Sequence, residues 1–323
     1  MAAGSLPEMA VNTKLRAAFT LVAGLGLAGC GAMLTSPLPV TPPDAASAPQ
    51  APAPLPPESA RLAAYYQRVE DGLLVQGLLR TDGGGPDVPY SARQLAETFE
   101  QIALFEEYTT SGNRLVARRN KSNLQRWRDP VVMRVSFGAS VPADQQQRDS
   151  DAVNAYARRL ARATGHPVRS ARSGANFNVL ILNEAERRTI GPLMRRLLPG
   201  ISDAAVESAV NMPRSTYCAV YAIAPGGKGE FSGAVAIIRG EHPDLLRLSC
   251  IHEELAQGLG LGNDSPSARP SIFNDDEEFG LLTTMDEQML SILYDRRLTP
   301  GMTAETARPI IRDIAAELTG GSS

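Results

Sequence analysis

The sequence predicts an α+β fold, in which a small mixed sheet lies against one helix that carries acidic residues, behind a helical N-terminal segment. Three observations predict it. Strand-like and helix-like segments follow one another irregularly after residue 130, amphipathic stretches fill residues 58–128, and no second linker interrupts the chain after residue 57. We therefore expect residues 58–323 to form a single domain.

Residues 1–29 have the features of a bacterial signal peptide. Lys14 and Arg16 precede an apolar run that is too short for a permanent membrane span. The run ends in LAGC at Cys30, which resembles the cleavage box of bacterial lipoproteins. The resemblance implies cleavage before Cys30, a lipid on Cys30, and a protein anchored in the bacterial cell envelope that faces the periplasm. An ordinary cleaved signal peptide, with Cys30 unmodified, is the alternative.

Residues 30–57 have the composition of a tether. Nine prolines lie between Pro37 and Pro57, without apolar periodicity. Such a segment favours extended polyproline geometry, and at about 3.1 Å per residue it could hold a domain on the order of 60 Å from a membrane.

The charge balance of the chain is slightly acidic. There are 32 basic and 35 acidic side chains, and without residues 1–29 the counts become 30 and 34. This balance argues against nucleic acid or an anionic membrane face as the partner. One local cluster is basic, and we interpret it as a solvated surface before the first strand: Arg114, Arg118, Arg119, Lys121, Arg126 and Arg128.

The helical segment of residues 58–128 contains two amphipathic stretches. Ser59 and Ser91 are suitable N-caps for them, and the second stretch runs to Tyr108. The segment ends before Pro130. The elements expected after it are a strand over 130–138, a helix over 144–165 that ends at a glycine, a strand over 176–183, helices near 184–197 and 202–210, a β-hairpin over 216–240, and helices over 242–261, 282–295 and 303–318.

The most informative stretch is CIHEELAQGLGLGND, which starts at Cys250 and ends at Asp264. The helix of a zinc peptidase has two histidines four residues apart, and a glutamate after the first one acts as the base. Counted from His252, the second ligand position is Ala256, which cannot coordinate a metal. The other two histidines of the chain lack ligand spacing.

Counted one residue later, the stretch resembles the metzincin family of zinc peptidases, whose pattern is His-Glu-x-x-His-x-x-Gly-x-x-His. Glu254 then takes the place of the catalytic base, and Gly260 that of the glycine that ends the helix. The three ligand positions differ, because Glu253, Gln257 and Asn263 replace three histidines. Amides are poor ligands of Zn²⁺, so we expect no zinc site. The resemblance implies a zincin-like fold.

The segments LLVQGLLRTDGG, STYCAVYAIA and the long stretch that contains HEELAQ and NDDEEF carry a more specific resemblance. They are similar to a bacterial envelope family called domain of unknown function 2927. This resemblance covers nearly all of residues 58–318. It implies the identity of the domain but no activity.

Three functions are compatible with these residues. In the first, oxygen atoms bind a hard metal ion such as Ca²⁺ or Mg²⁺. The alternative meaning of the acidic loop that follows the helix is a solvated surface. The oxygen ligands would come from Glu253, Gln257, Asn263, Asp264, Asp275 and Asp276.

In the second, the protein is an atypical hydrolase in which His252 and Glu254 are the catalytic residues. A lone histidine in a structural hydrogen bond is the alternative.

In the third, catalysis is lost, and an edge strand near residues 231–239 holds an extended peptide or an envelope protein by strand addition. We favour the third function, without a cofactor, because the lost ligands are visible and a substitute mechanism is not.

Two cysteines remain once Cys30 is assigned to a lipid. Cys218 lies in an expected strand and Cys250 in the expected helix. An oxidising envelope compartment allows them to form a disulfide, which would tie the helix to the sheet. Two buried free thiols are the alternative.

Overall fold

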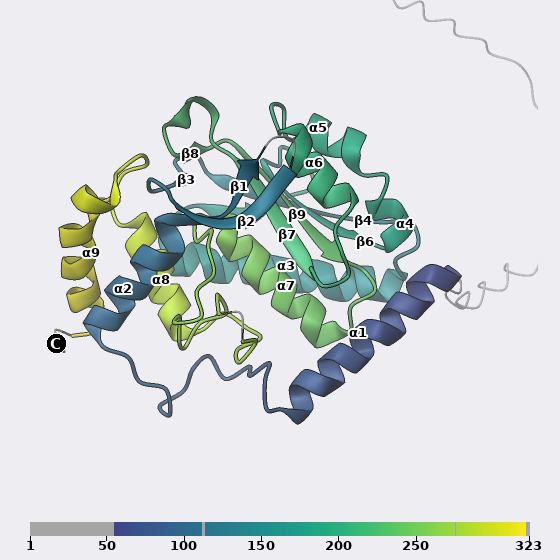
Figure 1. Ribbon diagram of the computed structural model, residues 1–323, viewed down its shortest axis with the longest axis horizontal. Coiled ribbons are helices and arrows are strands. Elements are labelled where there is room, and N and C mark those ends of the chain that lie inside the picture. The colour runs from purple at the N-terminus through teal and green to yellow at the C-terminus, as the bar shows by residue number, and fades with distance from the viewer. Residues whose placement is uncertain (1–54, 112–113, 275, 321–323) are drawn as a thin grey trace, which may run out of the picture. The chain divides into compact units, whose positions relative to one another are not determined.

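The computed structural model of the chain describes residues 55–111, 114–274 and 276–320, and of the segment 106–119 it describes the backbone alone (Figure 1). The expected signal peptide, Cys30, almost all of the expected tether and Asp275 lie outside the described residues. Among the helices of the described part, none combines the length and the apolar character that crossing a membrane requires.

The central sheet has five strands in the order β5-β4-β6-β9-β7. Four strands run parallel, and β7 at one edge runs antiparallel to β9. The central sheet is mixed and follows a helical N-terminal part in the sequence, which confirms the predicted α+β class. The strands span Val131–Phe137 (β4), Val168–Ser170 (β5), Phe177–Leu182 (β6), Cys218–Ile223 (β7) and Gly233–Arg239 (β9).

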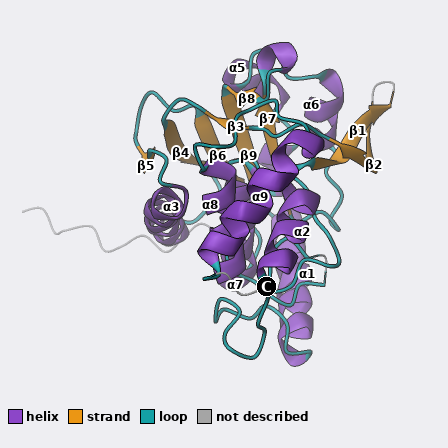
Figure 2. Cartoon of the chain, turned by 90° about the vertical axis from the view of Figure 1, so that its left-hand side faces the viewer, coloured by secondary structure: helices purple, strands orange, loops and turns teal. Residues whose placement is uncertain are grey.

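Helices cover both faces of this sheet (Figure 2). On one face, the main core packs against α3 (Ala143–Thr164), α7 (Asp244–Gln257) and α8 (Thr284–Tyr294). On the other face, a smaller apolar cluster includes side chains of α5 (Gly191–Leu197) and α6 (Asp203–Val210). The two faces of the sheet therefore have separate apolar cores.

The strand β9 is buried along its whole length, because it lies between β6 and β7. Its sequence GAVAIIR is almost entirely apolar, as is typical of strands that are covered on both faces. The prediction of an edge strand near residues 231–239 is therefore wrong. The edge strand is β7, the other strand of the predicted hairpin.

The N-terminal part contains α1 (Pro57–Val75) and α2 (Ala92–Ala103), followed by β1 (Phe105–Ser111) and β2 (Arg114–Lys121). The predicted helix was expected to continue to Tyr108, but α2 ends at Ala103. The backbone of β1 pairs with β2 in an antiparallel hairpin, and this strand pairing outweighs the helical pattern of the sequence there.

The caps of the helices agree in part with the prediction. Ser91 caps α2, because its Oγ accepts a hydrogen bond from the Gln94 backbone N–H at 3.2 Å. Ser59 lies inside the first turn of α1 and does not cap it. Gly165 ends α3 with a φ of 64°, as expected.

The remaining elements are β3 (Arg126–Trp127), α4 (Glu184–Arg187), the 3₁₀ turn η1 (Pro225–Gly227), β8 (Glu230–Phe231) and α9 (Ala304–Leu318).

A buried network of charges lies at α4. Glu184 accepts from Arg187 Nη2 at 2.6 Å and from Arg239 Nη1 at 2.5 Å, and all three side chains are more than nine-tenths buried. The same two arginines donate to backbone carbonyls at the C-terminal end of α6, at Ala209 and Met212. The network therefore fixes the position of α6 against the sheet.

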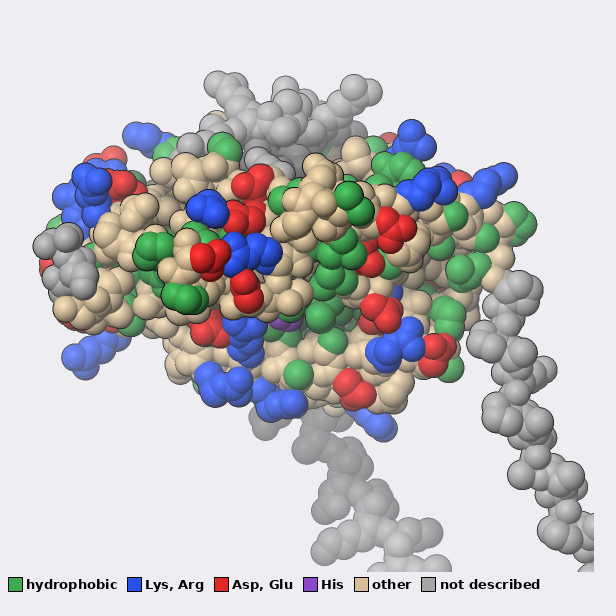
Figure 3. All heavy atoms as spheres, turned by 90° about the horizontal axis from the view of Figure 1, so that it is seen from below, with side chains coloured by type: hydrophobic (Ala, Val, Ile, Leu, Met, Phe, Trp, Pro, Cys, Tyr) green, Lys and Arg blue, Asp and Glu red, His purple; other side chains and the backbone are tan. Residues whose placement is uncertain are grey.

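Charged side chains of both signs are mixed on the surface. On the face drawn in Figure 3, acidic and basic groups lie next to one another and next to apolar ones. One of the surface ion pairs, the 3.3 Å pair between Arg80 and Glu278, joins the N-terminal segment to the loop before α8.

Candidate functional site

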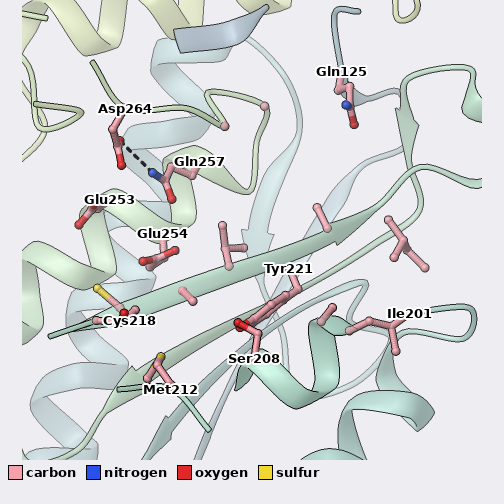
Figure 4. Close-up of a pocket in the computed structure, with 18 of the residues that line it drawn as sticks. Gln125, Ile201, Ser208, Met212, Cys218, Tyr221, Glu253, Glu254, Gln257 and Asp264 are labelled. Carbon is pink, nitrogen blue, oxygen red and sulfur yellow. Dashed lines mark hydrogen bonds between the residues drawn. The ribbon is translucent and has the colours of Figure 1, made fainter. Parts of the chain in front are cut away.

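A cleft of about 770 Å³ runs along β7, between α7 on one side and α6 on the other (Figure 4). From α7 and the loop after it, the cleft receives Glu253, Glu254, Gln257 and Asp264. From α6 it receives small and hydroxyl-bearing side chains, of which Ser208 is one. The cleft therefore has an acidic wall and a small, uncharged wall.

The strand β7 presents an open edge to this cleft. In the described part of the chain, its one strand partner is β9. The Ile223 carbonyl accepts from the Ser232 backbone N–H at 2.9 Å, on the side of β9. Backbone groups of an antiparallel strand alternate between its two sides, so the N–H and C=O groups of Val220 and Ala222 face the open edge.

The sequence of α7 explains why it directs acidic groups toward β7. Cys250, Glu253, Glu254 and Gln257 are spaced as i, i+3, i+4 and i+7, which places them on one face of the helix. Leu255 faces away from the cleft and is fully buried in the main core. The same helix thus packs through one face and lines the cleft through another.

Two carboxylates and one sulfur lie close together at this face. Single atoms of Cys218, Glu253 and Glu254 lie within 4.8 Å of one another. The sulfur of Cys218 is bonded to Cys250, so it offers no thiolate to a metal ion. The group therefore contributes two carboxylates, of which Glu254 is only 3% exposed.

The other two positions of the metzincin-like pattern hold amides that are engaged in hydrogen bonds. Gln257 Nε2 donates to Asp264 Oδ1 at 3.1 Å, within the cleft. Asn263 is buried, and its Nδ2 donates to the carbonyls of Gln101 at 2.8 Å and Asp264 at 2.7 Å. Asn263 thus joins the loop after α7 to α2, outside the set of described residues that line the cleft.

His252 is placed away from the cleft. Its ring stacks on Tyr156 of α3 with centroids 4.0 Å apart, and its Nδ1 accepts from the Leu282 backbone N–H at 3.1 Å. Burial and, to a smaller extent, the charge of Arg159 lower the pKa of His252 to about 3. The ring is therefore neutral at physiological pH, with its proton on Nε2.

Among its described residues, the acidic loop contributes one carboxylate to the cleft. Glu277 lines it, next to the acidic wall. Asp276 is exposed and accepts from the Glu278 backbone N–H at 2.9 Å, so it caps a turn. The Glu278 carboxylate forms an ion pair with Arg269 at 2.5 Å. Asp275, the remaining expected ligand, lies outside the described residues.

Residues of β7 and α6 were not expected in the site. The Tyr221 hydroxyl donates to Ser208 Oγ at 3.3 Å, and burial, helped by the charge of Glu254, raises the pKa of Tyr221 to about 12. Ser202 and Ala205 lie along the same wall. The signal that could have found them was the alternation in the strand CAVYAI, but it required knowledge of which hairpin strand lies at the edge.

The disulfide between Cys218 and Cys250 is present, with Cα atoms 5.9 Å apart. It joins the first residue of β7 to the middle of α7. This arrangement confirms the predicted link between the helix and the sheet, and it fixes one end of the cleft.

Gly260 lies three residues after the end of α7, in a conformation that favours glycine. Its φ is 126°, and a side-chain carbon at this position would collide with the backbone carbonyl of Gln125. The predicted helix end at Gly260 is thus three residues too late, but glycine has a steric reason at this position, because the segment before β3 passes directly against it.

Comparison with known proteins gives a family without an assigned activity. Residues 92–313 match the family described as "Protein of unknown function (DUF2927)". No curated protein matches the chain, and no solved structure does. The matched residues include the whole central sheet, α7 and every side chain of the cleft named above.

Proposed function

The chain belongs to the DUF2927 family of proteins of unknown function, and from this premise we propose that its domain binds an extended peptide along β7 without cutting it. The bound peptide would extend the central sheet by one strand, held by the outward backbone groups of Val220 and Ala222. The observation that carries the proposal is the open edge of β7 along a cleft of about 770 Å³.

The dimensions of the cleft suit such a ligand. The strand β7 has six residues, so its open edge is about 20 Å long at roughly 3.3 Å per residue. A peptide of similar length would pair along it. The cleft volume also falls in the range of about 300–1,000 Å³ that is common for ligand sites.

Binding is better supported than hydrolysis by the groups around Glu254. Gln257 and Asn263 carry amides at two of the ligand positions, and these amides bond to neighbouring oxygens. The one histidine of α7 lies on the other side of the helix, against Tyr156. We therefore propose a zincin-like domain in which a peptide cleft remains and the zinc ligands are lost.

The proposal is tested with a peptide that is selected on the purified full chain from a random library of extended sequences. N-methylation of the alternate amides that face β7 is expected to weaken binding at least tenfold, because each methyl group removes a strand hydrogen bond. N-methylation of the intervening amides, which face solvent, is the matched control and should leave the affinity within about threefold. Equal losses for both sets, or the absence of any selected peptide, would contradict strand addition.

We also propose that the protein is attached to the bacterial envelope by a lipid on Cys30, facing the periplasm. The LAGC sequence and the proline-rich segment after it support this attachment. Mass analysis of the protein extracted from membranes should find an N-terminal, lipid-modified Cys30, and Cys30→Ser should release the protein into the soluble fraction. An unmodified cysteine in membrane-extracted protein would contradict the anchor.

A further inference from the structure

The helix α1 packs against the outside of the domain (Figure 1) without joining either apolar core. Three of its 19 residues are buried, Ser59, Tyr66 and Glu70, and two of these are polar. Within the described residues, neither apolar cluster contains a side chain of α1. Most helices are held in place mainly by the burial of an apolar face. This source of stability is small for α1, so we expect α1 to open more easily than the core.

Tyr66 makes the central contact of α1 with the domain. Its hydroxyl donates to the Arg214 carbonyl at 3.0 Å, in the segment between α6 and β7. Its ring lies edge-on to the rings of His242 and Tyr217, with centroid distances of 4.4 Å and 6.0 Å. Tyr217 lines the cleft and directly precedes β7. Tyr66 therefore holds a side chain of the cleft wall in place.

Glu70 makes a second contact, with the helix α7. Its carboxylate accepts from the Leu246 backbone N–H at 2.8 Å, in the first turn of α7. The first N–H groups of a helix have no partner within it, so this bond acts as a cap. The ion pair of Glu58 with Arg188 is largely exposed and adds little. Polar and aromatic contacts thus connect α1 to two parts of the chain that border the cleft.

The contact surface under α1 includes the buried ring of His242. This residue is 3% exposed, and its Nε2 has no hydrogen-bond partner among the described residues. A buried polar atom without a partner has lost its bond to water and gained no replacement, which destabilises the buried state. Movement of the Tyr66 ring away from His242 would let water reach this atom. The release of α1 therefore has a compensating gain.

We infer that α1 is a detachable strap, which leaves the domain while the central sheet stays folded and thereby frees Tyr217 in the cleft wall. This helix is the first of the described chain, so a pull on the residues before Pro57 acts on it before any strand of the sheet. A peptide that binds beside a freed Tyr217 must first order this side chain, so the docked strap favours binding. That last step rests on the proposed peptide binding and adds a means of regulation to it.

The experiment measures amide hydrogen exchange of the purified full chain by mass spectrometry. We expect the amides of α1 to exchange at least about a hundredfold faster than those of β6 and β9, because α1 opens without unfolding of the sheet. Tyr66→Ala should accelerate exchange in α1 and in residues 214–218 by at least about tenfold more and leave β6 and β9 unchanged. Tyr66→Phe, which removes the hydroxyl bond alone, should have a smaller effect in the same two segments.

Gln67→Ala, an exposed change on the same helix, is the matched control and should leave exchange in residues 214–218 unchanged. If α1 exchanges at the rate of β9, it opens together with the sheet and the inference is wrong. A Tyr66→Ala variant that unfolds throughout would contradict the inference as well, because release of the strap must leave the sheet intact.

The peptide selected from the library provides the second readout. Tyr66→Ala is expected to weaken its binding at least about fivefold, and Gln67→Ala should leave it unchanged. An unchanged affinity in Tyr66→Ala, together with faster exchange in α1, would show that the strap detaches without regulating the cleft. If no library peptide binds, strand addition is wrong, and exchange in residues 214–218 still decides whether α1 holds Tyr217.

Discussion

Breaking the disulfide between Cys218 and Cys250 is expected to lower the free energy of unfolding by about 4 kcal/mol. The two cysteines are 32 residues apart, and loop-closure entropy for a loop of that length gives a value of this order. The loss would loosen β7 from α7, so peptide affinity at the cleft should fall with stability. The double variant Cys218→Ala, Cys250→Ala is compared with the native protein in urea unfolding.

A reducing agent provides the control for this prediction. It should destabilise the native protein by a similar amount and leave the double variant unchanged, because the variant has no bridge to reduce. A native protein whose unfolding midpoint is the same with and without reductant would show that the bridge does not contribute. The disulfide would then be a passive contact between strand and helix.

Replacing Glu184 with Gln is expected to lower the free energy of unfolding by about 3–5 kcal/mol. The change leaves the buried guanidinium groups of Arg187 and Arg239 without their carboxylate, and an uncompensated buried charge costs this much. Urea unfolding monitored by circular dichroism measures the loss. Glu58→Gln is the matched control, since its ion pair with Arg188 at 2.9 Å is largely exposed and contributes about 0–1 kcal/mol.

The contribution of Glu184 to the free energy of unfolding also depends on pH. Burial opposes its ionisation, but the ion pairs with Arg187 and Arg239 outweigh burial and hold the pKa of Glu184 below its usual 4.5. The folded protein thus binds this proton less tightly than the unfolded chain does, so the stabilisation is present above about pH 4.5 and is lost as the pH falls through the folded pKa. The difference between native protein and Glu184→Gln should shrink in acid. A constant difference from pH 7 to pH 3 would contradict this assignment.

Local patterns in the sequence predicted a large part of the fold. The 3.6-residue spacing predicted the helices. The two cysteines that remain after Cys30, in an oxidising compartment, predicted the disulfide between Cys218 and Cys250, which the structure confirms. Local patterns could not predict which strand of the hairpin lies at the edge. The strands CAVYAI and GAVAIIR are both apolar, and their order in the sheet depends on β6, which precedes them by more than 30 residues.

The sequence predicted the part of the candidate site that lies on one face of α7. The spacing of Glu253, Glu254 and Gln257 placed them together, and the structure does so. The placement of His252 and Asn263 depended on tertiary contacts with Tyr156 and Gln101, which no local pattern encodes. For the same reason, the α6 wall of the cleft could not be predicted from the sequence.

The edge of β7 that has no strand partner in the described part of the chain has a consequence for the protein at high concentration. Exposed apolar strands of one molecule tend to pair with those of another and so begin aggregates, and proteins protect them with nearby charges. Two molecules that meet through this edge are therefore expected to pair their β7 strands, unless a bound peptide already covers the edge.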